Sequence, residues 1–381
     1  MLSYLGYFST SFIIAVLVWP FASALLTLPI LAGLYHRYHR LRFMAVAAAY
    51  LSVLYVLGLV AFTLYPMPDD PQAFCAAHVG DYAPQLDVWR FLEDLRYGGL
   101  SGALQLAFNV VFFVPLGFVL TRWLRWRWWI VVPVGFLVSL CIETSQLTGF
   151  WGLYPCAYRQ FDVDDLLTNT LGAVAGIGVA KLFGLLVPQS VMPNPDAVNT
   201  RPGVIHRTVT FIIDMIFVAL VYFPLTLAVV FGFHAIATPL NDGTFRLFGL
   251  ITVGIGWLDM VAPISAAAAF LIFELLIPLT HHGQTLAGMF THMTIETKTR
   301  HGAARAAFYA IRSLVLGLLF LVDVVEFGGE ATMLRSYCMW AAAILFVFGA
   351  VTRRMPWDLI PGASPRVPAG KDGGKQAISR M

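Results

Sequence analysis

The residues best placed to do chemistry are polar side chains that recur at helical spacing within or beside strongly apolar stretches. Glu143 and Gln146 are three residues apart, so they share one face of a helix. Asp162, Asp165 and Asn169 follow at intervals of three and four residues, which again gives a single face. The full set, named here the outer polar cluster because of the topology derived below, consists of Asn109, Glu143, Gln146, Arg159, Asp162, Asp165 and Asn169.

Ionisable side chains inside a membrane are costly, and they normally face a bundle interior or a water-filled cavity. One interpretation of the outer polar cluster is structural: a buried hydrogen-bond network in which Arg159 neutralises Asp162 or Asp165. The other is a binding site for a polar headgroup or a cation, which is favoured because three carboxylates and one arginine exceed what helix registration needs. Paired carboxylates can also act as general acid and base. No nucleophile or metal triad accompanies them in the sequence, so catalysis is an alternative that the sequence permits but does not indicate.

A second polar pair lies in the C-terminal half and consists of Arg207 and Asp214. Arg207 and Asp214 are seven residues apart on one helical face, and Asp214 lies about two turns into an apolar run. A carboxylate in lipid with an arginine nearby can bind a monovalent cation or carry protons. The alternative is a static clamp in which these two residues, together with Asp358 from the resemblance described below, join the cytoplasmic ends of two helices. The sequence leaves both interpretations open.

Other residue types with chemical potential carry weaker patterns. Cys75 and Cys156 both fall in loops expected on the outer side, where disulfides form, but the sequence does not decide whether they pair. His281, His282 and His292 match no zinc-binding spacing, so no metal site is predicted. The sequence also lacks a Walker A motif and a dinucleotide fingerprint, and we predict no cofactor. The net charge of +3 is too small to indicate a nucleic-acid partner.

The composition identifies the elements that must position these residues. The chain has 381 residues, of which 59% are hydrophobic and 12% charged, and its mean hydropathy is +0.76. Soluble domains carry about 25% charged residues, so the composition predicts an all-α polytopic membrane protein surrounded by a lipid bilayer. Apolar runs of spanning length predict about nine transmembrane helices, at residues 11–34, 43–64, 103–121, 128–147, 163–187, 208–233, 262–280, 306–327 and 337–351.

A break in this pattern predicts two domains. Residues 188–206 are rich in Pro, Asn and Asp, which breaks helices, and we expect a cytoplasmic linker there. Residues 1–187 then form a five-helix membrane domain and residues 207–367 a four-helix membrane domain. The tail, residues 368–381, is expected to be disordered.

The basic residues predict the orientation in the cell membrane. If the chain alternates sides, only five of the 24 Lys and Arg residues fall on one side: Arg90, Arg96, Arg159, Arg246 and Arg335. The basic-rich side faces the cytoplasm by the positive-inside rule. The N-terminus is therefore expected outside and the C-terminus in the cytoplasm, which puts the outer polar cluster near the outer leaflet.

Two further segments have a distinctive pattern. Residues 66–102 form a long loop that is expected on the outer side and is named here the outer loop. Within it, residues 86–95 form an amphipathic stretch, which predicts either a helix lying flat on the membrane or a lid packed on the loops. Residues 247–257 precede a break at Asp259 and Pro263, and we expect an interfacial or re-entrant piece there.

Three strings in the N-terminal half resemble the VanZ-like family, which is named for a protein associated with teicoplanin resistance. They are FNVVFFVPLGFVL from Phe108, IETSQL from Ile142 and RQFDVDDLLTNTLGAVAG from Arg159. The matching positions are Asn109, Pro115, Gly117, Glu143, Gln146, Arg159, Asp162, Asp165, Asn169 and Gly172. The resemblance implies a role in susceptibility to glycopeptides that bear a lipid tail. With it, we expect the outer polar cluster to bind a lipid-linked cell-wall precursor or a lipoglycopeptide.

The C-terminal half resembles the RDD family, named for one Arg and two Asp. Arg207, Asp214 and Asp358 match those three positions. The resemblance extends to a loop motif made of Gly283, Gln284, Thr285 and Gly288. Three departures are Met289, where members often have Lys, Pro361, where they often have Ala, and Ser364, where they often have Thr. The resemblance implies a transport-related role, because some members are proposed to exchange cations for protons.

Overall fold

The structure is a computed structural model that describes residues 2–65, 67–97, 99–187, 197–240, 244–322, 324 and 331–363. Within these ranges, the side chains at positions 2–9, 94, 101, 331 and 332 are not described. Residues 188–196 of the expected linker and the whole tail at residues 368–381 lie outside the described residues.

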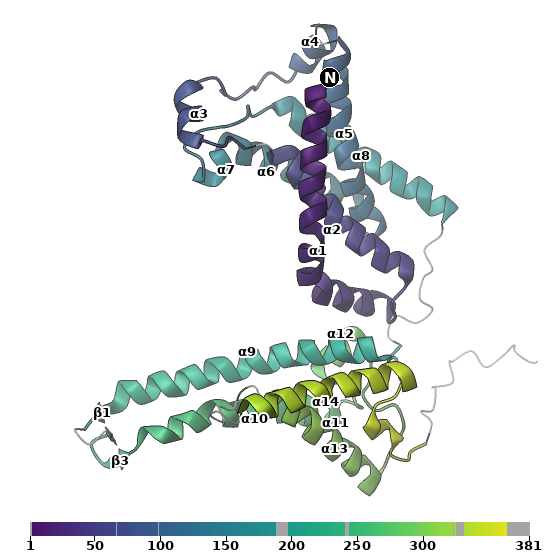
Figure 1. The fold of residues 1–381 in the computed structure, drawn as a ribbon. Helices are drawn as coiled ribbons and strands as arrows, with labels where there is room; N and C mark the ends of the chain where they lie inside the picture. The colour runs from purple at the N-terminus through teal and green to yellow at the C-terminus, as the bar shows by residue number, and fades with distance from the viewer. Residues whose placement is uncertain are drawn as a thin grey trace, which may run out of the picture. The chain divides into compact units, whose positions relative to one another are not determined.

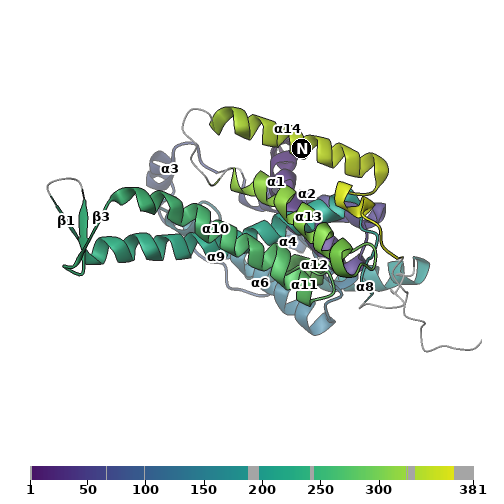
Figure 2. The ribbon, with the colours of Figure 1, turned by 90° about the horizontal axis from the view of Figure 1, so that it is seen from below.

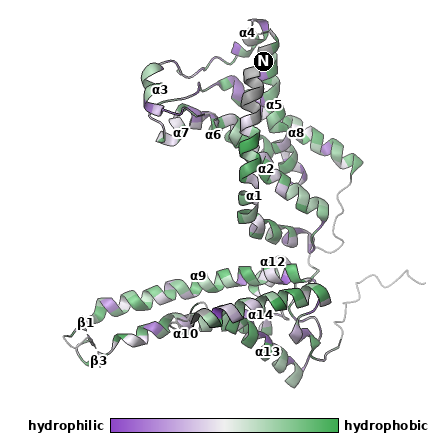
Figure 3. Ribbon diagram, viewed as in Figure 1, coloured by the Kyte–Doolittle hydropathy of each residue, from purple (hydrophilic) through white to green (hydrophobic). Residues whose placement is uncertain are grey.

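In the described part of the chain, nine helices are long and apolar enough to cross a membrane, which confirms the expected all-α polytopic fold. Hydrophobic residues extend along these helices (Figure 3). Helices suit this setting because they satisfy their own backbone hydrogen bonds in lipid. The nine spans are Thr10–Tyr38, Phe43–Leu64, Gly102–Arg122, Trp128–Leu147, Val163–Leu186, Val204–Ile236, Ile255–Thr280, Gly302–Leu321 and Met333–Thr352.

The chain divides into two compact units, the first formed by Met1–Thr27 and Phe43–Pro193 and the second by Leu28–Arg42 and Asn194–Met381. The first unit contains most of α1 and then α2 to α8 (Figure 1). Their bounds are α1 Leu2–Tyr38, α2 Phe43–Leu64, α3 Pro71–Ala77, α4 Arg90–Tyr97, α5 Gly99–Arg122, α6 Trp128–Leu147, α7 Gly149–Gly152 and α8 Val163–Leu186.

Glycines bring α5 and α8 into close contact in the first unit. A Cβ atom added to Gly172 would lie 2.2 Å from the carbonyl oxygen of Val110, and one added to Gly176 would lie 2.2 Å from that of Val114. Gly117 on α5 has the same relation to Ala173, at 2.0 Å. These residues therefore serve helix packing, as small residues do in membrane bundles.

A left-handed turn follows α6 and directs the chain into the loop that precedes α8. Gly149, Phe150, Trp151 and Gly152 all have positive φ angles, of 61°, 53°, 58° and 87°. A side chain at position 149 would meet the carbonyl oxygens of Tyr154 and Cys156 at 2.5 Å, so glycine is required there. The indole of Trp151 donates to the hydroxyl of Ser145 at 3.0 Å, which ties the turn back to α6.

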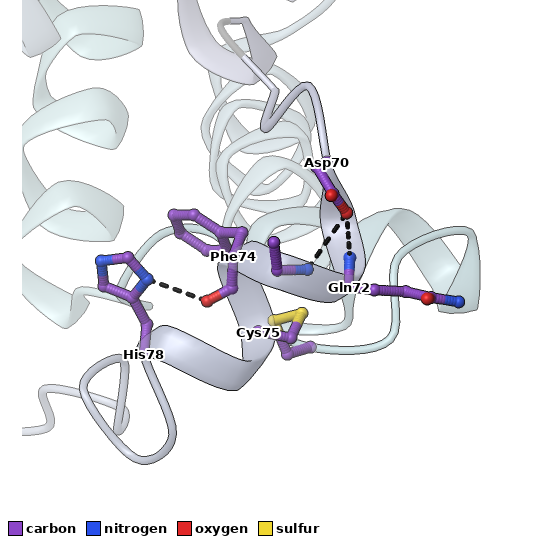
Figure 4. The surroundings of a disulfide bond; sticks show 7 residues. Asp70, Gln72, Phe74, Cys75 and His78 are labelled. Atoms are coloured by element: carbon purple, nitrogen blue, oxygen red, sulfur yellow. Dashed lines mark hydrogen bonds between the residues drawn. A yellow bond between two sulfur atoms is a disulfide. The ribbon is translucent and has the colours of Figure 1, made fainter.

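The structure joins Cys75 and Cys156 in a disulfide with the Cα atoms 5.8 Å apart. Cys75 lies on α3, whose N-terminus is capped by the Asp70 carboxylate (Figure 4). Asp70 accepts hydrogen bonds from the backbone N–H groups of Gln72 and Ala73, both at 3.1 Å. The disulfide therefore fastens a locally stable helix to the loop that precedes α8.

The second unit is built on α9, Val204–Ile236, with α10, Val261–Leu271, packed alongside it (Figure 2). Val218, Ala269 and Phe270 form the buried core between these two helices. The remaining elements are β1 Ala237–Pro239, β2 Phe245–Leu247, β3 Ile251–Val253, the 3-10 helix η1 Ile255–Met260, the π-helical segment η2 Ile272–Leu276, α11 Ile277–Thr280, α12 Leu286–Thr291, α13 Gly302–Leu321, α14 Ala331–Thr352 and the 3-10 helix η4 Pro356–Leu359.

The segment at residues 247–257 contains strands. β1, β2 and β3 form a small antiparallel sheet in sequence order at the far end of α9. The sequence predicted an interfacial or re-entrant piece there. It did not predict the strands, because the hydropathy pattern does not reveal strands of only three residues.

The end of α1 belongs to the second unit by its contacts, although the sequence suggested a first domain of residues 1–187. Tyr35 stacks on His206 with ring centroids 3.8 Å apart, and His36 stacks on Phe290 at 4.4 Å. His36 Nδ1 also lies 2.8 Å from the carbonyl oxygen of Phe290. Ring stacking thus attaches Leu28–Arg42 to α9 and α12.

Candidate functional site

The outer polar cluster begins where Glu143 on α6 meets the start of α8. The backbone N–H of Asp162 donates to Glu143 Oε2 at 3.0 Å. Asp162 is the N-cap of α8, and its carboxylate accepts from the backbone N–H of Asp164 at 2.8 Å. Asp165 lies in the first turn of α8 and is near enough to Glu143 for their charges to interact. Three carboxylates therefore gather at the N-terminal end of one helix, where the helix dipole favours negative charge.

Arg159 and Gln146 are attached to the end of α2. The guanidinium of Arg159 donates to the carbonyl oxygens of Thr63 at 3.1 Å and Tyr65 at 3.4 Å. The amide of Gln146 donates to the same Thr63 oxygen at 2.7 Å. Of the ion pairs within 4.0 Å among the described residues, none involves Arg159. The structural interpretation predicted an ion pair between Arg159 and Asp162 or Asp165, and no such pair is present among the described residues.

Two amide side chains complete the cluster from α5 and α8. The amide nitrogen of Asn109 donates to Asp165 Oδ1. Asn169, one turn further along α8, donates to the hydroxyl of Ser139 at 2.9 Å. The Oδ1 atom of Asn169 is buried and has no hydrogen-bond partner among the described residues. The seven cluster residues thus come together from α5, α6, α8 and the loop between α6 and α8.

Burial divides the cluster into two groups. Glu143, Gln146 and Asn169 are buried, with Glu143 only 2% exposed. The other four members are half-buried and can reach a molecule at the surface of the unit: Asn109, Arg159, Asp162 and Asp165.

A segment of the outer loop that includes α4 lies against the cluster, which is the kind of contact that the lid interpretation of residues 86–95 predicts. Gln85 forms an isolated β-bridge with Asp162 and is buried. The backbone N–H of Phe91, on α4, donates to Asp164 Oδ2 at 2.7 Å. Asp164 is 3% exposed and was missed because it lies on a different face of α8 from Asp162 and Asp165. With the disulfide at Cys75, the outer loop is attached beside the cluster at three separate points.

Tyr158 is a further buried group beside the cluster. Its backbone N–H donates to the carbonyl oxygen of Gln146 at 3.4 Å, and its hydroxyl is buried without a hydrogen-bond partner among the described residues. Burial raises the pKa of the Tyr158 phenol. The group is therefore a neutral hydroxyl in this site.

In the second unit, Arg207 pairs with Asp358 rather than with Asp214. Arg207 Nη2 lies 2.7 Å from Asp358 Oδ2, and Asp358 is 2% exposed. Asp358 also accepts hydrogen bonds from the hydroxyl of Thr297 at 3.1 Å and the backbone N–H of Met355 at 2.9 Å. The expected three-residue clamp is thus a two-residue clamp in the structure, and Asp214 has other neighbours.

Asp214 contacts the loop motif that was singled out in the sequence. Its Oδ1 atom accepts the backbone N–H of Ala287 at 2.9 Å, and the Thr285 side chain lies beside it. Thr285 caps α12 by accepting the backbone N–H of Gly288 at 3.0 Å. Gly283 has φ of +79° and leaves no room for a Cβ atom, since Thr294 Oγ1 would lie 2.6 Å away. The motif therefore shapes a turn that presents a backbone N–H to Asp214. Its remaining member, Gln284, donates a long hydrogen bond of 3.5 Å to the carbonyl oxygen of Met293.

A buried ion pair beside Asp214 was not predicted. Arg312 on α13 pairs with Glu274 and also donates to the Glu274 carbonyl oxygen at 3.0 Å. Glu274 is fully buried and lies in the π-helical segment η2, a backbone form that is frequent at functional sites. Asp214 is near enough to both groups for their charges to interact. The sequence showed Glu274 only as one acidic residue among several, because its partner is distant along the chain.

A cavity of about 270 Å³ lies next to these groups. Arg207, Asp214 and Arg312 are its charged lining residues, and most of the remaining wall is apolar. Among the described residues, no group of three or more His, Cys, Asp or Glu side chains has an arrangement suited to a metal ion.

The comparisons with known proteins agree with the two sets of motifs. A family model described as VanZ/LLP1 matches residues 52–184, a range that includes the whole outer polar cluster. A model described as the RDD family matches residues 201–362, which include Arg207, Asp214 and Asp358. No curated protein and no solved structure matches the chain. The protein therefore joins a VanZ-like domain in its N-terminal half to an RDD domain in its C-terminal half within one multi-pass membrane protein.

Proposed function

We propose that the VanZ-like domain binds the polar head of an amphipathic cell-envelope molecule at the outer leaflet, in an antibiotic-resistance-type role. The ligand is a lipid-linked cell-wall precursor or a lipoglycopeptide. The observation that carries the proposal is the gathering of Glu143, Asp162 and Asp165 beside a single Arg159 that forms no ion pair among the described residues.

The chemistry of the four half-buried residues defines the ligand. The carboxylate oxygens of Asp162 and Asp165 accept hydrogen bonds, so they suit hydroxyl and ammonium donors. Arg159 uses two of its N–H groups on backbone carbonyls, and an arginine has further N–H donors for a phosphate or carboxylate. A head that bears hydroxyl or amino groups together with an anionic group fits this combination.

The buried residues have a positioning role in this proposal. Glu143 accepts the Asp162 backbone N–H, which fixes the N-cap of α8 and with it the Asp162 side chain. Gln146 holds the same Thr63 carbonyl that Arg159 uses. Fixing these groups before the ligand arrives reduces the entropy cost of binding.

Direct binding to the purified protein tests the proposal. The probes are teicoplanin and a lipid-linked peptidoglycan precursor, and the variant is Asp165→Asn, which keeps an oxygen acceptor for Asn109. Hydrogen bonds to charged groups contribute about 1.5–3 kcal/mol, so we expect binding to weaken about tenfold or more. Asp69→Asn is the matched control, because Asp69 is an exposed acid of the same unit that lies in the outer loop and not in the cluster.

Susceptibility of a Gram-positive host gives the cellular readout. Wild type and Asp69→Asn are expected to change glycopeptide susceptibility at matched membrane levels, whereas Asp165→Asn and Glu143→Gln are not. Equal protection by all four proteins, together with unchanged binding by Asp165→Asn, would show that the cluster is structural.

A second candidate function concerns the RDD domain and is supported by a different observation. Asp214 Oδ2 and Glu274 Oε1 are buried and accept no hydrogen bond from the described residues, while Arg312 is the cation beside them. Two ionised carboxylates and one arginine leave one negative charge in excess, and a buried charge without a partner is costly. A proton or a monovalent cation at Asp214 would remove that excess, which is the basis for cation/proton exchange.

Proteoliposomes with an imposed pH gradient test the second candidate. Addition of Na⁺ or K⁺ is expected to dissipate the gradient with wild type and not with Asp214→Asn. Asp259→Asn is the control, because Asp259 is an exposed acid in η1 of the same unit. A gradient that wild type leaves unchanged with both cations would remove the exchange function.

A further inference from the structure

A second cavity in the RDD unit, of about 850 Å³, lies at the N-terminus of α9 and has no role in the functions proposed above. Its walls come from the start of α9 and the segment before it, from the segment before α13, and from the end of α14 and the residues that follow it, with Tyr35 of α1. Its charged lining residues are Arg201, Arg207, Lys298, Arg353, Arg354 and Asp358.

The charges of this basic cavity do not balance. Asp358 is its one carboxylate, and Asp358 is already paired with Arg207 at 2.7 Å. Among the described residues, the other four cations take part in no ion pair within 4.0 Å. Among the described residues, the ammonium group of Lys298 makes one long hydrogen bond, of 3.4 Å, to the carbonyl oxygen of Ile360. Four cations around one concave surface repel one another, and an anion bound there would relieve that repulsion.

The helix terminus adds to the positive potential of the same wall. α9 is 33 residues long, and its N-cap, Gly203, provides no side-chain cap. Gly203, Val204 and Ile205 all line the basic cavity. Uncapped N–H groups at a helix N-terminus and the positive end of its dipole favour anions.

The residue types indicate the class of anion. Guanidinium groups form paired hydrogen bonds that match the oxygens of a phosphate, and a lysine adds a compact charge. Arg353 and Arg354 are exposed and line the same cavity, so both guanidinium groups are available to one phosphate group. A phosphate ester fits this lining better than a single small anion, because the cavity is large and carries several cations.

The neighbouring cavity of about 270 Å³ gives room for an apolar part of the same ligand. Val204 and Arg207 line both cavities, so the Arg207–Asp358 pair lies at their common wall. On its other side the smaller cavity is lined by Phe211, Leu319 and Phe346 among other apolar residues. A basic chamber beside an apolar chamber is complementary to a phosphate head with a hydrocarbon tail.

We propose that the basic cavity binds a phosphate-bearing anion on the basic-rich side of the membrane. The phosphate can come from an anionic phospholipid or from a soluble phosphorylated compound. Arg353, Arg354 and Lys298 contact the phosphate, Arg201 and the start of α9 contribute positive potential, and the Arg207–Asp358 pair holds the wall.

The experiment uses the full-length protein in nanodiscs. One arm measures by native mass spectrometry how much phosphatidylglycerol the protein retains from a mixture with phosphatidylcholine. The other arm titrates pyrophosphate calorimetrically into the protein in phosphatidylcholine alone. The test variant combines Lys298→Gln, Arg353→Gln and Arg354→Gln. The matched control combines Arg125→Gln, Arg127→Gln and Lys181→Gln, which remove the same charge from the first unit.

Binding in either arm that weakens about tenfold or more in the test variant and not in the control supports the proposal. Retention of phosphatidylglycerol alone identifies a lipid, and pyrophosphate binding alone identifies a soluble phosphate. Absence of binding in both arms, or equal weakening by test and control variants, overturns the proposal. If the triple variant melts at a lower temperature than wild type, the exposed single variants Arg353→Gln and Arg354→Gln decide the outcome, with about threefold weakening expected for each. These readouts do not depend on glycopeptide binding or on cation exchange.

Discussion

Arg207 and Asp358 form an ion pair of 2.7 Å that connects the start of α9 with the segment after α14. Asp358 is 2% exposed, and its carboxylate also accepts hydrogen bonds from Thr297 and the Met355 backbone. Two of the three residues that define the RDD signature therefore act as one structural unit. The third, Asp214, belongs to a separate buried group with Glu274 and Arg312.

The first prediction concerns this ion pair. Arg207→Gln leaves the buried Asp358 carboxylate without its cation, and breaking a buried pair typically costs about 3–5 kcal/mol. Asp358→Asn is expected to cost less, because the Arg207 side chain is 11% exposed and can be hydrated, and because the amide oxygen still accepts from Thr297. Unfolding of the purified protein should give a coupling free energy of about 1–3 kcal/mol in a double-mutant cycle. Strictly additive effects would contradict a direct interaction.

The second prediction concerns the close contact between α5 and α8. Gly172→Ala places a methyl group 2.2 Å from the Val110 carbonyl oxygen, so the helices must separate. Overpacking of this kind costs about 1–3 kcal/mol, and the melting temperature of the protein should fall. Gly178→Ala on the same helix is the control, since nothing lies within 4 Å of its added Cβ atom. Equal melting temperatures for the two variants would show that α5 and α8 are further apart.

The third prediction concerns the disulfide. The bond closes a sequence separation of 81 residues and fastens α3 next to the outer polar cluster. The double variant Cys75→Ser, Cys156→Ser should be less stable by about 2–5 kcal/mol and should be cleaved faster by protease in the outer loop. Cys338→Ser, at a free cysteine, is the control. Stability that a reducing agent leaves unchanged in the wild type would argue against the bond.

The fourth prediction concerns orientation. We expect Asp69 on the outer side and Arg40 in the cytoplasm, because of the distribution of basic residues. With Cys141 and Cys338 replaced by Ser, a membrane-impermeant maleimide should label Asp69→Cys in intact cells. The same reagent should label Arg40→Cys only after permeabilisation. The reverse pattern would invert the topology and place the outer polar cluster in the cytoplasm.

The sequence located the outer polar cluster because its members are related by local geometry. Glu143 and Gln146 share a face of α6, and Asp162, Asp165 and Asn169 share a face of α8, through spacing alone. The meeting of α5, α6 and α8 depends on glycine contacts between distant segments. Gln85 and the buried Asp164 were missed because their contacts form only when the outer loop returns to the start of α8.

The choice of partners in the RDD domain also required the tertiary structure. The spacing of Arg207 and Asp214 places them on one helical face, so the sequence predicted that their side chains interact. The folded chain brings Asp358 to Arg207 instead, and it brings Glu274 and Arg312 near Asp214. A helical pattern reports which residues share one helix face, but it carries no information about which distant side chain lies opposite that face.

By itself, the sequence determined that the protein is a multi-pass membrane protein with nine apolar spans, and it identified the motifs of both domains. It could do so because hydropathy over about 20 residues is a local property that suffices for a spanning helix. Only the tertiary structure decided that Cys75 and Cys156 pair, that Arg207 holds Asp358, and that one cavity is lined by four cations with no ion pair among the described residues. The physical reason is that these features depend on the distance between side chains far apart in the chain, and packing of the helices sets that distance.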